Sequence, residues 1–235
     1  MRKSIKNVAL CMAAALFLTA CGNSQQSATT AAANSTDAVK TEAAQSDGAE
    51  ESAEGGGNVL IAYFTAAENS VVDAVSSASV VTIDGEAKGC VQTVAEMIQE
   101  TAGGELFSIQ TSVDYPGDIG ELIDYAAIEQ DENERPELTT HIENLEDYDV
   151  IFVGYPNWWY DMPMVMYSFF EEYDFSGKTI IPFNVHNGSR FSSTISTIQE
   201  LEPEATVIED GFTVSINNVT AAEESVKEWV DALNY

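Results

Sequence analysis

The sequence is poor in cysteine, histidine and basic residues. Its 235 residues include three Cys, two His and nine Lys and Arg, against 39 Asp and Glu, which gives a formal net charge of −30. Such a charge makes nucleic acid an unfavourable partner and opposes docking on anionic lipid. It is typical of a solvated surface, with electrostatic steering of partners as the alternative. The two histidines have no carboxylate at ligand spacing, so the sequence does not indicate a metal site.

The sequence also lacks an apolar run long enough to form a stable membrane span. The run Val8–Leu18 is short, follows three basic residues and leads into Leu18–Cys21. This arrangement resembles a bacterial lipoprotein signal, in which the cysteine is lipidated and becomes the mature N-terminus. The resemblance predicts a signal peptide over residues 1–21, a lipidated Cys21 and a location on the extracytoplasmic face of the cell membrane. An ordinary cleaved signal is the alternative.

Residues 22–57 consist mostly of Ala, Ser, Thr, Gln, Gly and acids, with Val39 as the only larger aliphatic residue. Such a segment cannot bury enough apolar surface to offset the entropy lost on ordering. We therefore expect a disordered tether with a root-mean-square reach of roughly 30–36 Å. Because Cys11 lies in the signal and Cys21 is expected to carry lipid, Cys90 remains alone, and no disulfide can form within the folded domain.

From residue 58 to residue 235 the chain alternates strand-like and helix-like segments, which is typical of an α/β domain with a parallel sheet. The expected strands are Asn58–Phe64, Glu105–Gln110, Asp149–Gly154, Thr179–Phe183 and Thr206–Ile208, the last with a possible continuation over Gly211–Ile216. The expected helices are Val91–Thr101, Asp118–Gln130, Met162–Tyr173, Ser193–Leu201 and Thr220–Leu233. Thr220 and Glu223 have capping-box spacing at the start of the last helix.

The segment between the first expected strand and the first expected helix, Thr65–Cys90, is much longer than an ordinary βα loop. Loops of this length in compact domains are usually functional or disordered. This one follows a strand whose end borders the binding crevice of an open parallel sheet. Within it, we interpret Val80–Gly85 as a small hairpin arm.

The most informative segment is Tyr148–Pro163. Here an apolar strand stops at a glycine and continues into a loop that carries the adjacent Trp158 and Trp159. Ligands of open parallel sheets bind at the carboxyl ends of the strands, so these aromatic side chains are expected where a planar ring can stack. The alternative is that they are core or partner-contact residues, because tryptophan is highly buried on average.

Three segments at expected strand ends, Val59–Thr65, Gly154–Trp159 and Phe183–Ser189, together resemble the flavodoxin family. In that family the corresponding loops hold the phosphate of FMN and the faces or edges of its isoalloxazine ring. The resemblance implies a three-layer, doubly wound, five-stranded parallel sheet with strand order 2-1-3-4-5 over residues 58–235. It also implies a non-covalent FMN site, in which at least one of the two tryptophans contacts the flavin. The cofactor-binding residues expected from the last two segments are Pro156, Asn157, Trp158, Trp159, His186, Asn187, Gly188 and Ser189.

The expected phosphate loop departs from the family pattern. The family has Ser/Thr-x-Thr-Gly-Asn-Thr between first strand and first helix, whereas this chain has Thr65–Ser70, with Glu68 in place of the glycine. We predict a split site, in which Thr65 supplies a hydroxyl and the insertion loops out. The turn and backbone N–H groups then come from Gly89, Cys90, Val91 and Gln92. Two lost side-chain hydrogen bonds, at roughly 1.5–3 kcal/mol each, weaken such a site without abolishing it.

Three further residues of these segments have individual interpretations. His186 is placed by the resemblance at the ring edge, and the alternative is an ordinary polar loop residue. Gly188 is expected in a turn that requires positive φ. Cys90 is interpreted as a small residue of the phosphate turn, because a redox thiol would need a second cysteine to resolve it.

The sequence as a whole predicts a lipid-anchored, extracytoplasmic flavodoxin-like protein that binds FMN and transfers electrons. Its partner would be a redox protein or a small acceptor such as a quinone. One alternative is an FMN-dependent NAD(P)H or quinone reductase on the same scaffold. Another is a cofactor-free interaction module, because a fold does not guarantee a function.

Overall fold

The computed structural model describes residues 58–70, 80–83 and 85–235. The predicted signal peptide, the lipidated Cys21 and the tether 22–57 lie outside these residues, so they remain predictions. Among the described residues, no helix is both long and apolar enough to span a membrane.

The centre of the domain is a parallel sheet. Its strands in chain order are β1 (Val59–Tyr63), β4 (Glu105–Ser108), β5 (Val150–Pro156), β6 (Thr179–His186), β7 (Thr206–Val207) and β8 (Phe212–Ser215). They pair in the order β4-β1-β5-β6-β7, with β8 also against β6. The predicted fold class and the strand order 2-1-3-4-5 are confirmed.

The fifth position of the sheet is shared by two short strands. β7 pairs with the start of β6, through Ile180, and β8 pairs with its end, from Phe183 onward. Pro182 lies between these two pairings and has no N–H to donate, so a continuous ladder cannot form there. Six strands, rather than five, therefore build the described sheet.

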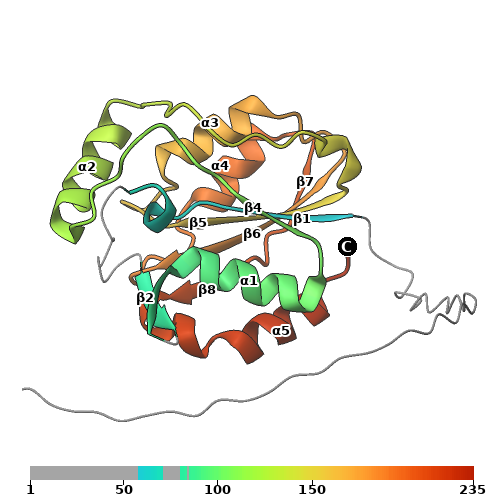
Figure 1. Cartoon of the computed structure of the whole chain (residues 1–235). Coiled ribbons are helices and arrows are strands. Elements are labelled where there is room, and N and C mark those ends of the chain that lie inside the picture. The colour runs from blue at the N-terminus through green and yellow to red at the C-terminus, as the bar shows by residue number, and fades with distance from the viewer. Residues whose placement is uncertain (1–57, 71–79, 84) are drawn as a thin grey trace, which may run out of the picture. The chain divides into compact units, whose positions relative to one another are not determined.

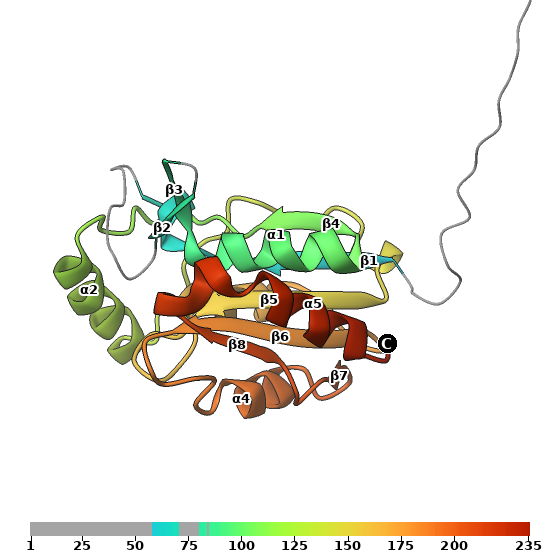
Figure 2. The same cartoon turned by 90° about the horizontal axis from the view of Figure 1, so that it is seen from below.

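Helices cover both faces of the sheet (Figures 1 and 2). The helices α3 (Met164–Glu172) and α4 (Thr194–Leu201) cover one face, and α1 (Cys90–Ala102) and α5 (Glu223–Ala232) cover the other. Successive residues of β1 alternate between the two faces, so Leu60 and Ala62 join one core, whereas Val59 and Ile61 join the other. Burial on both faces explains why the strands read as continuous apolar runs.

The helix boundaries agree with the sequence-based expectations to within one or two residues, except at the last helix. A 3₁₀ helix, Ile216–Ala221, occupies the expected first turn, and α5 begins only at Glu223. The proposed capping box is therefore wrong, because Ala222 is the N-cap and, in the described chain, no side chain caps it. Burial of Val219 and Ala222 in the core favours the tighter 3₁₀ turn over a helix capped by Thr220.

The long segment after β1 contains an antiparallel hairpin, β2 (Val80–Ile83) and β3 (Glu86–Gly89). Gly85, in the connecting turn, has φ of 88°. The predicted hairpin arm is confirmed, and it extends to Gly89, from which the chain enters α1 directly. The hairpin and helix α2 (Ile119–Asp131) lie at the end of the sheet where the parallel strands finish (Figure 1).

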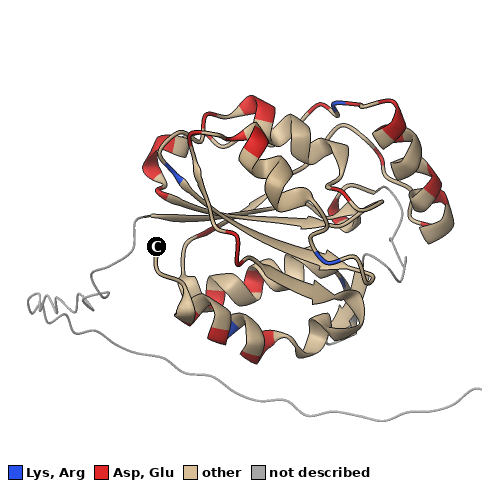
Figure 3. Ribbon diagram, turned by 180° about the vertical axis from the view of Figure 1, so that it is seen from behind, with Lys and Arg blue, Asp and Glu red and all other residues tan. Residues whose placement is uncertain are grey.

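The negative charge is spread over the surface. Asp and Glu lie on helices on both sides of the sheet and on loops, whereas Lys and Arg are few (Figure 3). This distribution agrees with a solvated acidic surface.

Candidate functional site

A pocket of about 550 Å³ opens where β5 and β6 end. Its volume is within the range of roughly 300–1,000 Å³ that is typical of small-molecule sites. The loop after β5 and the loop after β6 form two of its walls, and one face of α2 forms a third. The residues predicted from these two loops all line it: Pro156, Asn157, Trp158, Trp159, His186, Asn187, Gly188 and Ser189.

The other predicted residues lie outside this pocket, at the end of β1. Thr65 and Gly89 are in direct contact, since a Cβ atom on Gly89 would lie 2.5 Å from Oγ1 of Thr65. The two ends of the insertion thus meet, and the Thr65 hydroxyl lies against the N-terminus of α1. Thr65, Cys90 and Val91 are buried, and Gln92 is partly buried.

The N-terminus of α1 has the features of an anion site. Gly89 is its N-cap and, among the described residues, no side chain caps the N–H groups of the first turn. Uncapped N–H groups at a helix start attract anions, through hydrogen bonding and through the helix dipole. The Thr93 hydroxyl donates to the carbonyl of Gly89 at 2.9 Å, which fixes the turn.

Glu68, which stands in place of the family glycine, is held by neighbouring strands. Its carboxylate accepts hydrogen bonds from the Ser108 hydroxyl at 2.6 Å and from the Tyr63 hydroxyl at 3.3 Å. Burial and the nearby carboxylate raise the pKa of Tyr63, so this phenol stays protonated and donates. The carboxylate of Glu68 therefore lies beside Tyr63 of β1 and Ser108 of β4.

Asn69 fixes the loop that follows β1. Its amide nitrogen donates to the carbonyls of Thr65 at 3.0 Å and Ile109 at 3.3 Å, and its Oδ1 accepts from the N–H of Thr111 at 2.9 Å. The side chain is buried. Because these bonds join the loops after β1 and β4, the position of Thr65 is set by the surrounding backbone.

The two adjacent tryptophans have different surroundings. Trp158 packs edge to face against Phe64 and Tyr115, with ring centroids 5.8 and 5.5 Å away. Trp159 lines the pocket and is 50% exposed, and its indole N–H donates to the carbonyl of Ile123 on α2 at 3.0 Å. Trp158 thus joins the pocket to the core, and Trp159 joins it to α2.

A tight turn places these side chains. The backbones of Trp158 and Asp161 exchange two hydrogen bonds of 2.9 Å, and the central residues Trp159 and Tyr160 have φ of 49° and 68°. Such two-residue turns with positive φ usually contain Asn and Gly. A bulky residue in this conformation costs roughly 1–2 kcal/mol. Tyr160 also lines the pocket and was not predicted, although it directly follows the tryptophan pair.

The walls formed by the loops after β5 and β6 are tied together. The Asn157 side chain donates to the carbonyl of Arg190 at 3.0 Å and accepts from the Ser189 hydroxyl at 2.8 Å. The buried Asn184 donates to the same carbonyl at 2.9 Å. Gly188 has φ of 104°, which confirms the predicted turn. These bonds fix the loops after β5 and β6 relative to each other.

His186 presents a neutral ring to the pocket. Its Nδ1 accepts a hydrogen bond from the N–H of Gly188 at 2.8 Å, which places the proton on Nε2. Burial and the charge of Arg190 both lower the pKa of His186. At neutral pH the imidazole is therefore an uncharged hydrogen-bond donor.

Cys90 does not have the environment of a redox thiol. The side chain is 2% exposed, and burial raises the pKa of its thiol to about 11. A thiol that stays protonated is a poor nucleophile. Cys90 therefore behaves as a small apolar residue at the start of α1.

The third wall of the pocket was not predicted. Ile119, Leu122, Ile123 and Ala126 of α2 line it, and Ile216 adds an aliphatic side chain after β8. The four α2 residues have the i, i+3, i+4, i+7 spacing of one helix face. That spacing was available in the sequence, but it does not reveal what the face packs against.

Comparison with known proteins agrees with this architecture. The flavodoxin family model matches residues 79–233, which is more than half of the chain. A candidate flavoprotein from Bacteroides uniformis is 26% identical, with a TM-score of 0.58, over 75% of this chain and 99% of that one. A second, from Bacteroides eggerthii, is 24% identical, with a TM-score of 0.58, over 76% of this chain and 98% of that one. A search of curated proteins found no match. The chain belongs to the flavodoxin family.

Proposed function

We propose that this protein binds FMN non-covalently and transfers electrons. The observation that carries the proposal is the arrangement at the carboxyl ends of three neighbouring strands. A hydroxyl against an uncapped helix N-terminus follows β1, and an aromatic pocket with fixed hydrogen-bond donors follows β5 and β6. When bound, FMN supplies the redox chemistry, and the chain supplies binding, orientation and electrostatics.

The residues present fit such a cofactor. Trp158 and Trp159 offer flat apolar surfaces to a planar ring. The Nε2–H of His186 offers a neutral donor to the polar edge of that ring. The Thr65 hydroxyl and the first N–H groups of α1 offer donors to a phosphate.

The test is a titration of the purified protein with FMN and, separately, with riboflavin, which has the same ring but no phosphate. Flavin fluorescence and visible absorption report binding. We expect saturable quenching at one FMN per chain, with weaker binding of riboflavin. Equal affinities would contradict the phosphate site. No quenching with either flavin would contradict the proposal and favour the cofactor-free interaction module.

The proposal includes an extracytoplasmic location on the membrane, anchored through lipidated Cys21, and electron exchange with a redox protein or a quinone. Its support is the sequence pattern around Leu18–Cys21. Labelling with a radioactive fatty acid tests it, because Cys21→Ser should abolish both the label and retention in the membrane fraction. Labelling of the Cys21→Ser protein would contradict the anchor.

A second candidate is an FMN-dependent NAD(P)H or quinone reductase. It is favoured by the apolar face of α2, which gives the pocket a wall that a small planar substrate can contact. Steady-state oxidation of NAD(P)H with a quinone as acceptor distinguishes it from a carrier. A carrier would show reduction only with a protein donor.

A further inference from the structure

Helix α2 is attached to the rest of the domain far more lightly than α1, although both have 13 residues. The buried residues of α1 are Cys90, Val91, Thr93, Val94, Ala95 and Ile98, whereas those of α2 are Leu122, Ala126 and Glu129. Ile123 and Ile128 of α2 are 45% and 58% exposed. In Figures 1 and 2, α2 stands outside the two helical layers, at the end of the sheet. A helix with so little apolar burial opens locally at low cost.

Besides the packing of Leu122 in the core and of Tyr125 on Tyr115, polar contacts around the pocket hold the body of α2. The Trp159 indole donates to the carbonyl of Ile123 at 3.0 Å, and the Tyr115 hydroxyl donates to Glu129 at 3.0 Å. Gln130 makes a longer contact of 3.5 Å with Asp161, in the same turn as Trp159. The turn after β5 is therefore one of the supports of α2.

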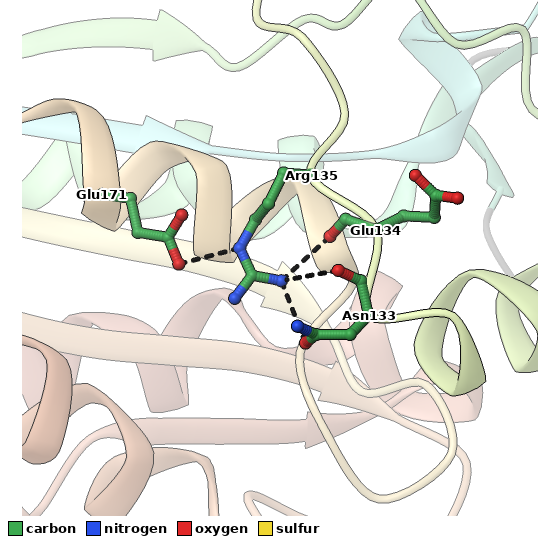
Figure 4. Close-up of polar contacts among 4 residues, drawn as sticks. All are labelled: Asn133, Glu134, Arg135 and Glu171. Carbon is green, nitrogen blue, oxygen red and sulfur yellow. Dashed lines mark hydrogen bonds and ion pairs between the residues drawn. The ribbon is translucent and has the colours of Figure 1, made fainter.

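The chain just after α2 is anchored to α3 (Figure 4). Arg135 donates to Glu171 at 2.7 Å and lies 5.0 Å from the centre of the Tyr167 ring. The same guanidinium donates to the carbonyls of Asn133 and Glu134, at 3.2 and 3.0 Å. Asn133 has φ of 51°, so the chain reverses sharply between the helix and this anchor. The segment that directly follows α2 is thus fixed to α3.

The contact made by Trp159 depends on a strained backbone. Trp159 and Tyr160 both have positive φ, and they are 50% and 71% exposed, so burial of their side chains does not explain the conformation. Strain of this kind persists where a particular presentation of side chains is needed. Here the turn directs the indole N–H across the mouth of the pocket to α2.

We propose that α2 is a lid over the pocket and that the Trp159 indole is the clasp that holds it closed. Opening moves the apolar face with Ile119, Leu122 and Ile123 away from the loops after β5 and β6, and admits a planar ligand from the side. In this role Trp159 acts through α2, in addition to the ring contact proposed above. With FMN as the ligand, the inference rests on the function proposed above, but the lid itself can be tested without any ligand.

The first experiment is hydrogen–deuterium exchange of the ligand-free, full-length protein. In the wild type, we expect amides of α2 to exchange by local opening, faster than those of α1. Trp159→Phe keeps the aromatic ring and removes the N–H donor, so α2 should exchange about fivefold faster, the factor expected from one lost hydrogen bond. Trp229→Phe is the matched control. Trp229 lies on α5, and its indole also donates to a backbone carbonyl, that of Asp210, at 2.9 Å.

Exchange of α2 as slow as that of α1 in the wild type would overturn the lid, and this comparison needs no variant. Unchanged α2 exchange in a folded Trp159→Phe protein would overturn the clasp. The same acceleration of α2 in Trp229→Phe would show a general loss of stability and would also overturn it.

The second experiment measures FMN association and dissociation by stopped-flow fluorescence. A clasp that closes the lid before the ligand arrives slows its entry. Trp159→Phe should therefore raise the association rate constant about fivefold, whereas a weakened ring contact by itself would raise only the dissociation rate constant. An unchanged association rate constant would show that Trp159 acts on the ligand only by direct contact and would overturn the clasp. Absence of FMN binding in the wild type would refute the proposed function but leave the exchange experiment decisive for the lid.

Discussion

Replacing Gly89 with alanine should introduce a methyl group into space that Thr65 already fills. The new Cβ would lie 2.5 Å from Oγ1, 2.9 Å from Cγ2 and 3.0 Å from Cβ of Thr65. Gly89 has φ of −59° and ψ of 136°, a conformation that alanine adopts without strain, so the main cost is steric. Thr65 cannot easily retreat, because it is 2% exposed and Asn69 bonds to its carbonyl.

Overpacking of this kind typically costs about 1–3 kcal/mol, and we expect Gly89→Ala to lower the free energy of unfolding by that amount. Thr65→Ala removes the two closest atoms, Oγ1 and Cγ2, and leaves a contact at 3.0 Å. The double variant should therefore be more stable than the sum of the single effects predicts, by at least about 0.5 kcal/mol. Urea unfolding of the wild type, both single variants and the double variant measures this coupling.

Additive effects would refute the contact between the two segments and, with it, the split phosphate site. Thr65→Val separates stability from binding, because valine keeps the shape and loses only the hydroxyl. Loss of a hydrogen bond to a charged group, about 1.5–3 kcal/mol, should weaken FMN binding by about 10- to 150-fold. Riboflavin affinity should not change. Equal weakening of both flavins would show that Thr65 supports the fold of the site rather than the phosphate.

Three further predictions concern the pocket and its charge. Asn157→Ala removes the bonds to Arg190 and Ser189, so it should cost about 1–2 kcal/mol in urea unfolding and weaken FMN binding, whereas Ser189→Ala, which removes one bond, should cost less. The pKa of His186 in the folded protein is lowered from 6.5, so as the pH drops the unfolded chain binds this proton before the folded chain does. The free energy of unfolding should therefore fall as the pH drops below 6.5, and His186→Gln should remove the contribution of this residue to that fall. A charge of −30 should bring the reduction potential of bound FMN below that of free FMN, by an amount that added salt diminishes; a potential at or above the free value in a redox titration would contradict this.

The layers of the fold were predictable because its strands are buried on both faces, and such strands are continuous apolar runs between helical patterns. The order of the strands was not readable from periodicity and came from the resemblance. The division of the fifth strand into β7 and β8 depends on Pro182 in the neighbouring strand β6. It was therefore not visible in the sequence of the fifth strand itself. The failed capping box at Thr220 has a similar origin, since local spacing favoured it and burial of Val219 outweighed it.

The two loops of the pocket were predictable for a geometric reason. Parallel strands that are neighbours in the sheet end at the same edge, so the loops after β5 and β6 must meet. The wall supplied by α2 was not predictable in this way. The spacing of its apolar residues identifies one apolar face of the helix. The helix lies beyond the end of the sheet, however, where strand pairing does not determine its position. The conformation of the turn at Trp159 and Tyr160 was not predictable from the sequence either, because residues of these types rarely adopt positive φ.

The contact between Thr65 and Gly89 shows that a long insertion need not separate the two segments of the proposed phosphate site. In the inserted hairpin, Val80 pairs directly with Gly89, so the second strand returns the chain to the place where the first began. The helix that follows therefore starts beside Val80, and Gly89 also lies against Thr65 at the end of β1. The antiparallel hairpin accounts for the return of the chain between Val80 and Gly89. The contact of Gly89 with Thr65 then brings together the two segments of the proposed phosphate site, so the length of the insertion gives little information about that site.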